Sequence, residues 1–319
     1  MAVNWLRRGF LAAACASAAL LAACGSSTIE SALSPSRIIV FGDGMADVGQ
    51  NGSRYTVNDA SLNVWTAQLA GRYDLTLTAA SAGGTGYARG NARIAAKPDA
   101  AGNAATLTMA EQIDAFRAAG GVFGDSDLVV LNGGVADVVA EMAAVNAGTE
   151  TSDQMLANLK QAGRDLGAQA QRLVAAGAQH VFVVGSIDLG RTPWGTAIDK
   201  RSLLTNASLE FNNAFLISVV GMGKNVFYVD SAYYFNLMTG SPGSYAFDTS
   251  ETPVCTSVDP GNGIGIGAGE VNSALCNAST LLPGVTDYSK YVYADKIYPT
   301  PAAHRQFGDW AYDRLRTQW

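Results

Sequence analysis

Four short apolar runs recur along the chain, separated by long polar and mixed stretches. They are Ile38–Phe41, Leu128–Leu131, Val181–Val184 and Val226–Val229. Continuous apolar runs of this length are typical of strands that are buried on both faces, whereas half-exposed strands alternate apolar and polar residues. The first run ends at a Gly-Asp-Gly turn. The pattern therefore predicts four core strands.

Stretches with helical spacing of apolar residues precede the last three runs. Met109–Ala119, Asp153–Ala176 and Asn206–Val220 have apolar residues three and four positions apart, as amphipathic helices do. Alternation of strand and helix at these spacings favours parallel strands joined by helical crossovers. We predict an α/β fold with a single doubly wound, mostly parallel sheet and helices on both faces, a three-layer α/β/α arrangement.

The loops that follow the strands are the expected place for a functional site. In doubly wound sheets the ligand crevice lies at the carboxyl ends of the strands. We therefore expect Gly42–Gly49, Asn132–Asp137 and Gly185–Pro193 to meet there. A later region, Ser241–Lys290, is rich in Gly, Pro, Ser and Asn, and its composition indicates a long excursion from the domain rather than a second domain.

Composition narrows the class of protein. The 319 residues are 48% hydrophobic, enough for a sizeable core, so disorder is not expected for most of the chain. Only 15% are charged and the net charge is −6. With no basic stripe to neutralise phosphates, nucleic acid is excluded as an expected partner.

The first residues indicate export. Arg7 and Arg8 precede an apolar run, Phe10–Ala23, that is too short to span a bilayer as a mature helix. Small residues before Cys24 resemble a lipobox, so we predict a signal peptide over 1–23, acylation of Cys24 and a tether over 24–36 leading to a domain over 37–319. By resemblance to sorted lipoproteins, Gly25 favours the outer membrane. The alternative is an ordinary secretory signal and a secreted protein.

Two cysteines remain for the mature domain. Cys15 leaves with the predicted signal and Cys24 would be acylated, which leaves Cys255 and Cys276. An oxidising compartment permits them to form a disulfide, which we expect. Two unpaired buried thiols are the alternative. No histidine lies near them in sequence, so a metal motif is not indicated.

Four ordered segments then resemble the characteristic blocks of one enzyme family. They are Val40–Gly49, Tyr87–Ala92, Gly134–Asp137 and Tyr293–Thr300. Together they resemble the GDSL, or SGNH, esterase and lipase family, and supporting similarity extends over nearly all of 37–319. The resemblance implies the three-layer fold predicted above and, in active members, hydrolysis of ester bonds.

The same resemblance assigns catalytic positions, three of which are substituted. Family members have serine as nucleophile where this chain has Gly44, asparagine as oxyanion donor at Ala136, and histidine as base at Tyr298. Asp295 occupies the position of the triad acid, and the amide of Gly90 matches a backbone oxyanion donor. Acyl transfer needs nucleophile, base and oxyanion donors together. Only Asp295 and the amides of Gly44 and Gly90 are retained.

No other residue is a good replacement. Ser53 and Thr56 follow Gly44 in the same loop but are expected to be ordinary loop residues. A tyrosine is a poor base at neutral pH because its unperturbed pKa is about 10. His180 starts a strand at the end opposite the crevice, so we expect it at the surface. His304 matches a family histidine outside the triad, so we expect it to have a structural role.

These observations favour a catalytically degenerate, envelope-anchored lipoprotein with a ligand-binding or accessory role. Loss of the serine and histidine could enlarge a pocket for an acyl-ester, lipid or glycan ligand. No cofactor and no metal are expected. The alternative is an active ester hydrolase that uses a non-standard nucleophile or a metal-activated water. Four crevice aspartates would then be the candidate metal ligands: Asp43, Asp47, Asp137 and Asp295.

Overall fold

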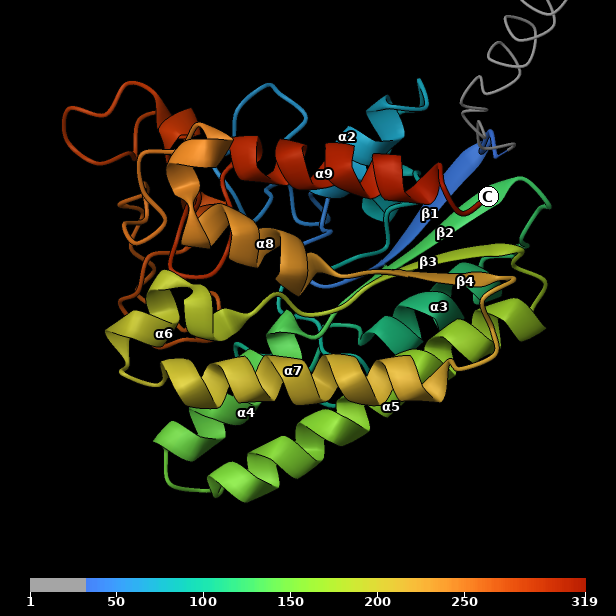
Figure 1. Ribbon diagram of the computed structural model, residues 1–319, viewed down its shortest axis with the longest axis horizontal. Helices are drawn as coiled ribbons and strands as arrows, with labels where there is room; N and C mark the ends of the chain where they lie inside the picture. Colours follow the sequence, from blue (N-terminus) through green and yellow to red (C-terminus); the bar gives the residue numbers. More distant parts are fainter. Residues whose placement is uncertain (1–32) are drawn as a thin grey trace, which may run out of the picture.

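The computed structural model describes residues 33–319, and the predicted signal peptide, the predicted acylation site Cys24 and most of the predicted tether lie outside them. Four parallel strands form one sheet in the order β1-β2-β3-β4 (Figure 1). They are β1 (Arg37–Gly42), β2 (Asp127–Asn132), β3 (His180–Val184) and β4 (Val226–Val229). All four predicted strands are confirmed, and they are largely buried because they carry apolar side chains on both faces.

A further extended segment, 85–89, lies along the other side of β1. The Val40 amide donates to the Thr85 carbonyl at 3.0 Å, and Tyr87 and Arg89 donate to the carbonyls of Val40 and Gly42 at 2.7 and 3.0 Å. The chain thus passes first to one side of β1 and only afterwards to β2 on its other side. Such a reversal is the switch point of a doubly wound sheet, and it places the crevice beyond the ends of β1 and β2.

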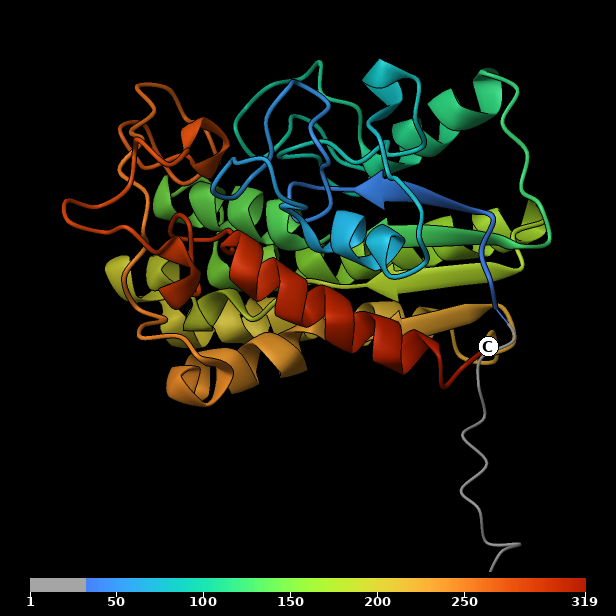
Figure 2. The same cartoon turned by 90° about the horizontal axis from the view of Figure 1, so that it is seen from above.

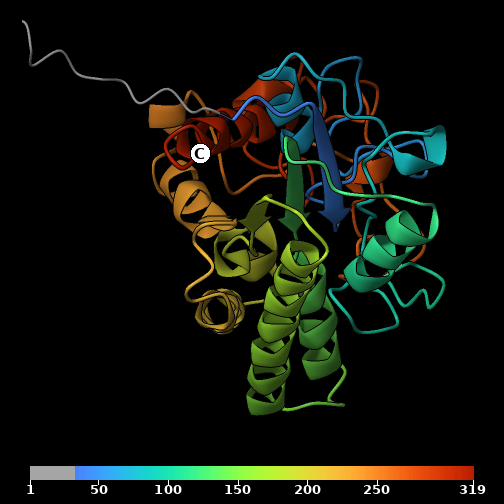
Figure 3. The same cartoon turned by 90° about the vertical axis from the view of Figure 1, so that its right-hand side faces the viewer.

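The reversal also explains the two helical layers. Because crossovers between parallel strands are right-handed, opposite directions of travel put helices on opposite faces. One face is covered by α2 (Trp65–Gly71), α8 (Ser231–Gly240) and α9 (Pro301–Leu315). The other is covered by a larger group, seen on the opposite side of the strands in Figures 1 and 3. Its members are α3 (Met109–Ala118), α4 (Val135–Asn146), α5 (Ser152–Ala175) and α7 (Arg201–Ser218). The predicted α/β/α class is confirmed.

Local chemistry sets several helix starts. Thr108 caps α3 and Thr151 caps α5, each through a capping box with Glu111 or Gln154 three residues later. Each box satisfies amide donors that lack an intrahelical partner. α7 begins five residues earlier than the apolar spacing predicts. In its first turn Arg201 and Ser202 are exposed, Leu203 is partly buried against the core and Leu204 is buried, so the apolar pattern is weak there.

The excursion after α8 contains only short 3₁₀ turns: η3 (Pro242–Tyr245), η4 (Ser273–Leu275) and η5 (Tyr288–Lys290). It lies at the crevice end of the sheet (Figure 2). A disulfide joins Cys255 and Cys276, whose Cα atoms are 5.9 Å apart, which confirms the predicted pairing. With Val57, Val254 and Ala294 these cysteines form a small buried cluster separate from the main core. The disulfide therefore fixes the excursion against the crevice loops.

Replacing both disulfide cysteines by serine is expected to lower the free energy of unfolding by about 3 kcal/mol, because the bond closes a loop of 21 residues in the unfolded chain. Urea unfolding of the oxidised protein and of the double variant measures the difference. Adding reductant should affect the parent and leave the variant unchanged. Equal stability of parent and variant would contradict a stabilising role of this crosslink.

Within residues 33–319, none of the helices combines the length and apolarity needed to cross a bilayer.

Candidate functional site

The ends of β1 and β2 are held together by close backbone contact. A Cβ atom built on Gly42 would overlap the Asn132 carbonyl oxygen, so no other residue fits there without movement. The Gln112 side chain accepts from the Gly42 amide at 2.8 Å and donates to its carbonyl at 2.9 Å. The Trp65 indole donates to the Asn132 side chain at 2.8 Å. These bonds fix the start of the loop that carries Gly44.

Two buried aspartates support the crevice loops. Asp43 accepts from the Met45 amide at 3.0 Å, and Asp137 accepts from the Ile94 amide at 3.1 Å and faces Arg93 at 3.4 Å. Burial raises the pKa of Asp43 to about 7, opposed by backbone amides. Burial likewise raises the pKa of Asp137 to about 6, opposed first by the charge of Arg93. Both carboxyls therefore bind protons more tightly in the folded protein.

These raised pKa values predict that part of the folding stability is lost as pH rises from about 4 to about 7. In that window the folded state holds protons on Asp43 and Asp137 that the unfolded chain has released, so raising the pH favours unfolding. Urea unfolding at intervals from pH 4 to 8 measures this slope. The Asp43→Asn variant should show a shallower decline than the parent. An identical slope would show that Asp43 titrates normally.

Gly44 and Tyr298 lie in direct contact. A Cβ atom built on Gly44 would lie 2.7 Å from the Tyr298 hydroxyl oxygen and 2.8 Å from its Cζ atom. Tyr298 is only 1% exposed, and burial raises the pKa of its phenol well above the ordinary value. The tyrosine ring therefore fills the space next to the nucleophile position. The expectation of an enlarged pocket is wrong at this point of the crevice.

Asp295 is fully buried and engaged by backbone amides. One carboxylate oxygen accepts from Ile297 and Tyr298 at 2.8 and 2.6 Å, and the other accepts from Ser273 at 3.0 Å. Its bond to Tyr298 thus comes from the backbone. Because Ser273 belongs to the disulfide-bonded excursion, Asp295 ties that excursion to the turn before α9. Burial raises the pKa of Asp295 in spite of these donors.

Gly90 lies under a second tyrosine. Its amide donates to Asp47 at 2.8 Å, and the other oxygen of Asp47 accepts from Gly49 and Gln50. A Cβ atom built on Gly90 would overlap the Tyr55 hydroxyl group and ring. The expectation that the Gly90 amide is available to an oxyanion is therefore wrong in this structure, because Asp47 already accepts from it.

The rings of Tyr55 and Tyr298 pack together, with centroids 5.0 Å apart. One tyrosine thus lies against Gly44 and the other against Gly90, and the pair covers the two backbone positions expected to bind an oxyanion. Ala136, which stands where active family members have their side-chain oxyanion donor, is 1% exposed in the first turn of α4. Nothing in the sequence around Tyr55 pointed to this role.

A family model described as GDSL-like Lipase/Acylhydrolase matches residues 38–311. This chain belongs to the GDSL family. An uncharacterized protein of the trpE-trpG intergenic region of Pseudomonas putida is similar at 26% identity over 304 residues. That alignment includes 89% of this chain but 49% of the relative, so the chain spans about half of its length. A solved crystal structure aligns at 10% identity with a TM-score of 0.41, over 89% of this chain and 98% of its own.

Thr56 and the two histidines make structural contacts in this GDSL domain. The Thr56 hydroxyl donates to the Pro299 carbonyl at 2.8 Å. His304 is fully buried, accepts from the Trp65 amide at 3.3 Å, and has a pKa lowered by burial to about 3. His180 starts β3, at the end of the sheet away from the crevice, and packs against Trp319. His304 is thus held neutral by burial and accepts from a backbone amide at the start of α2.

The four aspartates considered as metal ligands in the GDSL crevice lie in the loop after β1, in the first turn of α4 and in the turn before α9. In the part of the chain that the structure describes, no three His, Cys, Asp or Glu side chains are grouped closely enough to hold a metal ion. Asp43, Asp47 and Asp295 each accept from backbone amides, and Asp137 accepts from an amide and faces Arg93. Their observed contacts stabilise the loops.

Proposed function

We propose that this GDSL domain has lost serine-esterase catalysis and acts as an accessory domain of an envelope lipoprotein. Three substitutions support the proposal: Gly44 supplies no nucleophile, Ala136 no side-chain donor, and Tyr298 no base at neutral pH. In this proposal acylation of Cys24 anchors the domain to the outer membrane, and Gly25 favours that destination.

The contact between Gly44 and Tyr298 is the observation that most strongly supports the proposal. A serine side chain at residue 44 would overlap the tyrosine ring, since even its Cβ atom would lie 2.7 to 2.9 Å from three ring and hydroxyl atoms. Loss of the serine alone, without the tyrosine ring beside it, would leave space next to residue 44. An acyl-ester, lipid or glycan ligand at the nucleophile position would have to displace Tyr298, so we propose the accessory role ahead of ligand binding in this crevice.

The test is turnover of short nitrophenyl esters by the purified protein, together with labelling by a serine-directed fluorophosphonate. We expect neither above the level of a heat-denatured sample. An active GDSL esterase treated in the same way is the positive control. Turnover that survives purification to homogeneity, or labelling mapped to any serine of the domain, would overturn the proposal.

The anchor is tested separately by mass spectrometry of the mature amino terminus. We expect cleavage before Cys24 and an acylated Cys24, and we expect the Cys24→Ser variant to lose this modification. A mature terminus elsewhere, with an unmodified chain released from the membrane, would support the secreted alternative.

A further inference from the structure

The last turn of α7 and the connection just after it present apolar side chains to solvent. Ile217 is 74% exposed, Val220 is 81% exposed and Leu216 is 39% exposed. The opposite face of the same helix is well buried through Phe211 and Phe215. An amphipathic helix normally turns such residues toward the core, so this outward group is the unusual part of α7.

This apolar group lies at the end of the sheet where the described chain enters it. α7 ends at Ser218, shortly before β4 begins at Val226, and β4 is in register with the other strands. Arg37 starts β1 at the same end of the parallel sheet. Four neighbouring strands are about 14 Å wide from first to last. The entry point and the end of α7 therefore share one end of the domain (Figure 1).

The position of that entry point decides which partner the surface meets. This step rests on the proposed acylation of Cys24. Twelve residues lie between Cys24 and Arg37, so thirteen residue-to-residue steps join the two. Even fully extended they would span at most roughly 45 Å, since a residue adds about 3.3 to 3.6 Å. A lipid at Cys24 thus attaches the domain to the bilayer through this end, while the crevice lies at the other end of the strands.

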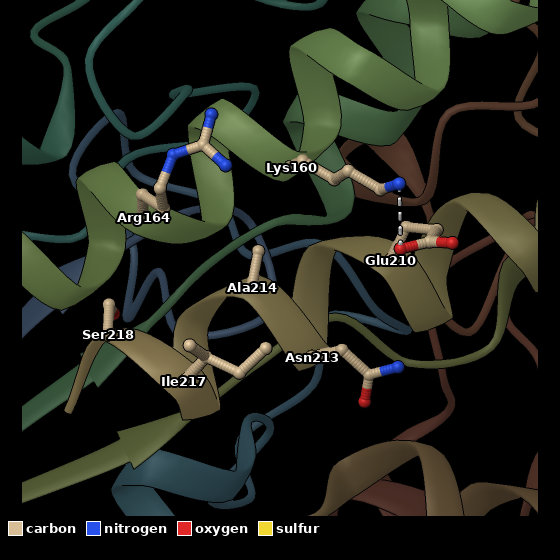
Figure 4. A pocket seen from close by; sticks show the side chains of 7 residues that line it. All are labelled: Lys160, Arg164, Glu210, Asn213, Ala214, Ile217 and Ser218. Carbon is tan, nitrogen blue, oxygen red and sulfur yellow. Dashed lines mark ion pairs between the residues drawn. The ribbon is translucent and has the colours of Figure 1, made fainter. Parts of the chain in front are cut away.

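A groove beside Ile217 adds cationic groups. It has a volume of about 360 Å³ between α5 and α7. Figure 4 shows Arg164 on α5 above Ala214 and Ile217 on α7, with Lys160 paired to Glu210 farther along. The nitrogen–oxygen distance in that pair is 3.4 Å. Lys160 and Glu210 neutralise each other, so Arg164 leaves the groove with one net positive charge.

Arg164 and Lys224 are both without a carboxylate partner among residues 33–319. Arg164 donates only to the Gln161 side chain, at 3.1 and 2.7 Å. Lys224 is exposed in the connection between α7 and β4. Apolar side chains flanked by unpaired cations are the pattern of surfaces that insert shallowly into an anionic bilayer.

We propose that the end of α7 docks on the anionic phospholipid surface of the membrane that carries the anchor. Leu216, Ile217 and Val220 enter the region between headgroups and acyl chains, and Arg164 and Lys224 contact lipid phosphates. We call these five residues the α7 docking surface. The lipid anchor supplies the attachment, and this surface sets the orientation of the domain.

Single-cysteine labelling tests the orientation in the full-length, membrane-anchored protein. Cys255 and Cys276 are joined, so an introduced cysteine is the reactive thiol once Cys24 is acylated. Ile217→Cys and Val220→Cys are labelled with an environment-sensitive fluorophore. Tyr233→Cys is the matched control, because Tyr233 is 55% exposed and follows the opposite end of β4. The protein is reconstituted in vesicles made of phosphatidylethanolamine with a minor share of phosphatidylglycerol.

We expect blue-shifted emission and quenching by lipid-borne quenchers at residues 217 and 220, and neither at residue 233. Equal, water-like emission at all three sites would overturn the docking surface while leaving the anchor intact. If the protein without an introduced cysteine reacts with the fluorophore, Cys24 is free, and this result would contradict the proposed anchor. If the emission at residues 217 and 220 shifts to the blue in detergent as the protein concentration rises, these residues contact a second copy of the chain, which would overturn the membrane docking.

Charge variants provide an independent readout in the same vesicles. Arg164→Gln and Lys224→Gln should each reduce quenching at residue 217, corresponding to about fivefold weaker surface association, because a basic residue at an anionic surface contributes about 1 kcal/mol. Arg305→Gln, which removes an exposed cation in the second turn of α9, is the control and should have no effect. Quenching unchanged by both docking-surface variants would contradict the phosphate contacts.

Discussion

Replacing Tyr298 by alanine is expected to lower the free energy of unfolding by about 3 to 5 kcal/mol, the usual cost of truncating a large buried aromatic side chain. Tyr298 is 1% exposed and packs against Tyr55 and Gly44. Because Gly44 has no side chain, the residue in contact with the ring offers nothing to fill the cavity. Urea unfolding monitored by far-UV circular dichroism measures the change.

Two further variants make this prediction specific. Tyr233→Ala removes an exposed tyrosine and should change stability by no more than about 0.5 kcal/mol. Tyr298→Phe keeps the ring and should retain most of the stability. If Tyr298→Ala were as stable as the parent, the ring would not be filling the crevice, and the observation that carries the proposed function would fail.

The second large effect is a gain of activity in the triple variant Gly44→Ser, Ala136→Asn, Tyr298→His. It restores a nucleophile, a side-chain oxyanion donor and a base three residues after Asp295. Loss of the nucleophile or base of a serine hydrolase lowers kcat by about 10⁶, so the restored set should raise ester turnover by several orders of magnitude over the parent. Nitrophenyl-ester hydrolysis measures the gain, and fluorophosphonate labelling should map to the serine introduced at residue 44.

The single variant Gly44→Ser is the matched control. With Tyr298 still in place, the new side chain overpacks the crevice and should cost about 1 to 3 kcal/mol without producing activity. Adding Tyr55→Ala to the triple variant should increase labelling, since Tyr55 lies over Gly90. A triple variant that is folded but inert, with and without Tyr55→Ala, would show that the crevice cannot be returned to esterase geometry.

The strands could be predicted from sequence almost to the residue because burial on both faces leaves a continuous apolar run. Ile38–Phe41 lies within β1, and Val226–Val229 coincides with β4. The segment 85–89 could not be predicted in this way. It is short and contains Thr85 and Gly86, and it pairs with β1 by three backbone hydrogen bonds that depend on no side-chain pattern. The reversal of the sheet at β1 was therefore visible only in the structure.

The candidate site was predictable as a set of positions but not as a set of contacts. Ordered blocks identified Gly44, Gly90, Ala136, Asp295 and Tyr298. A block describes residues close in sequence, whereas the packing of the Tyr298 ring on Gly44 joins residues from opposite ends of the domain.

The same limit applies to Tyr55, which belongs to no block and yet lies over Gly90. The engagement of the Gly90 amide by Asp47 likewise joins two different blocks. Such contacts arise from tertiary packing, which spacing along the chain does not encode.

The close packing of Gly44 and Tyr298 also bears on how such a domain can change over generations. A serine appearing at residue 44 meets the tyrosine ring, and a histidine appearing at residue 298 leaves part of the ring's volume empty and has no serine to activate. Each single step back costs stability and yields no catalyst. A lineage that has acquired both residues therefore has no easy one-step return to ester hydrolysis.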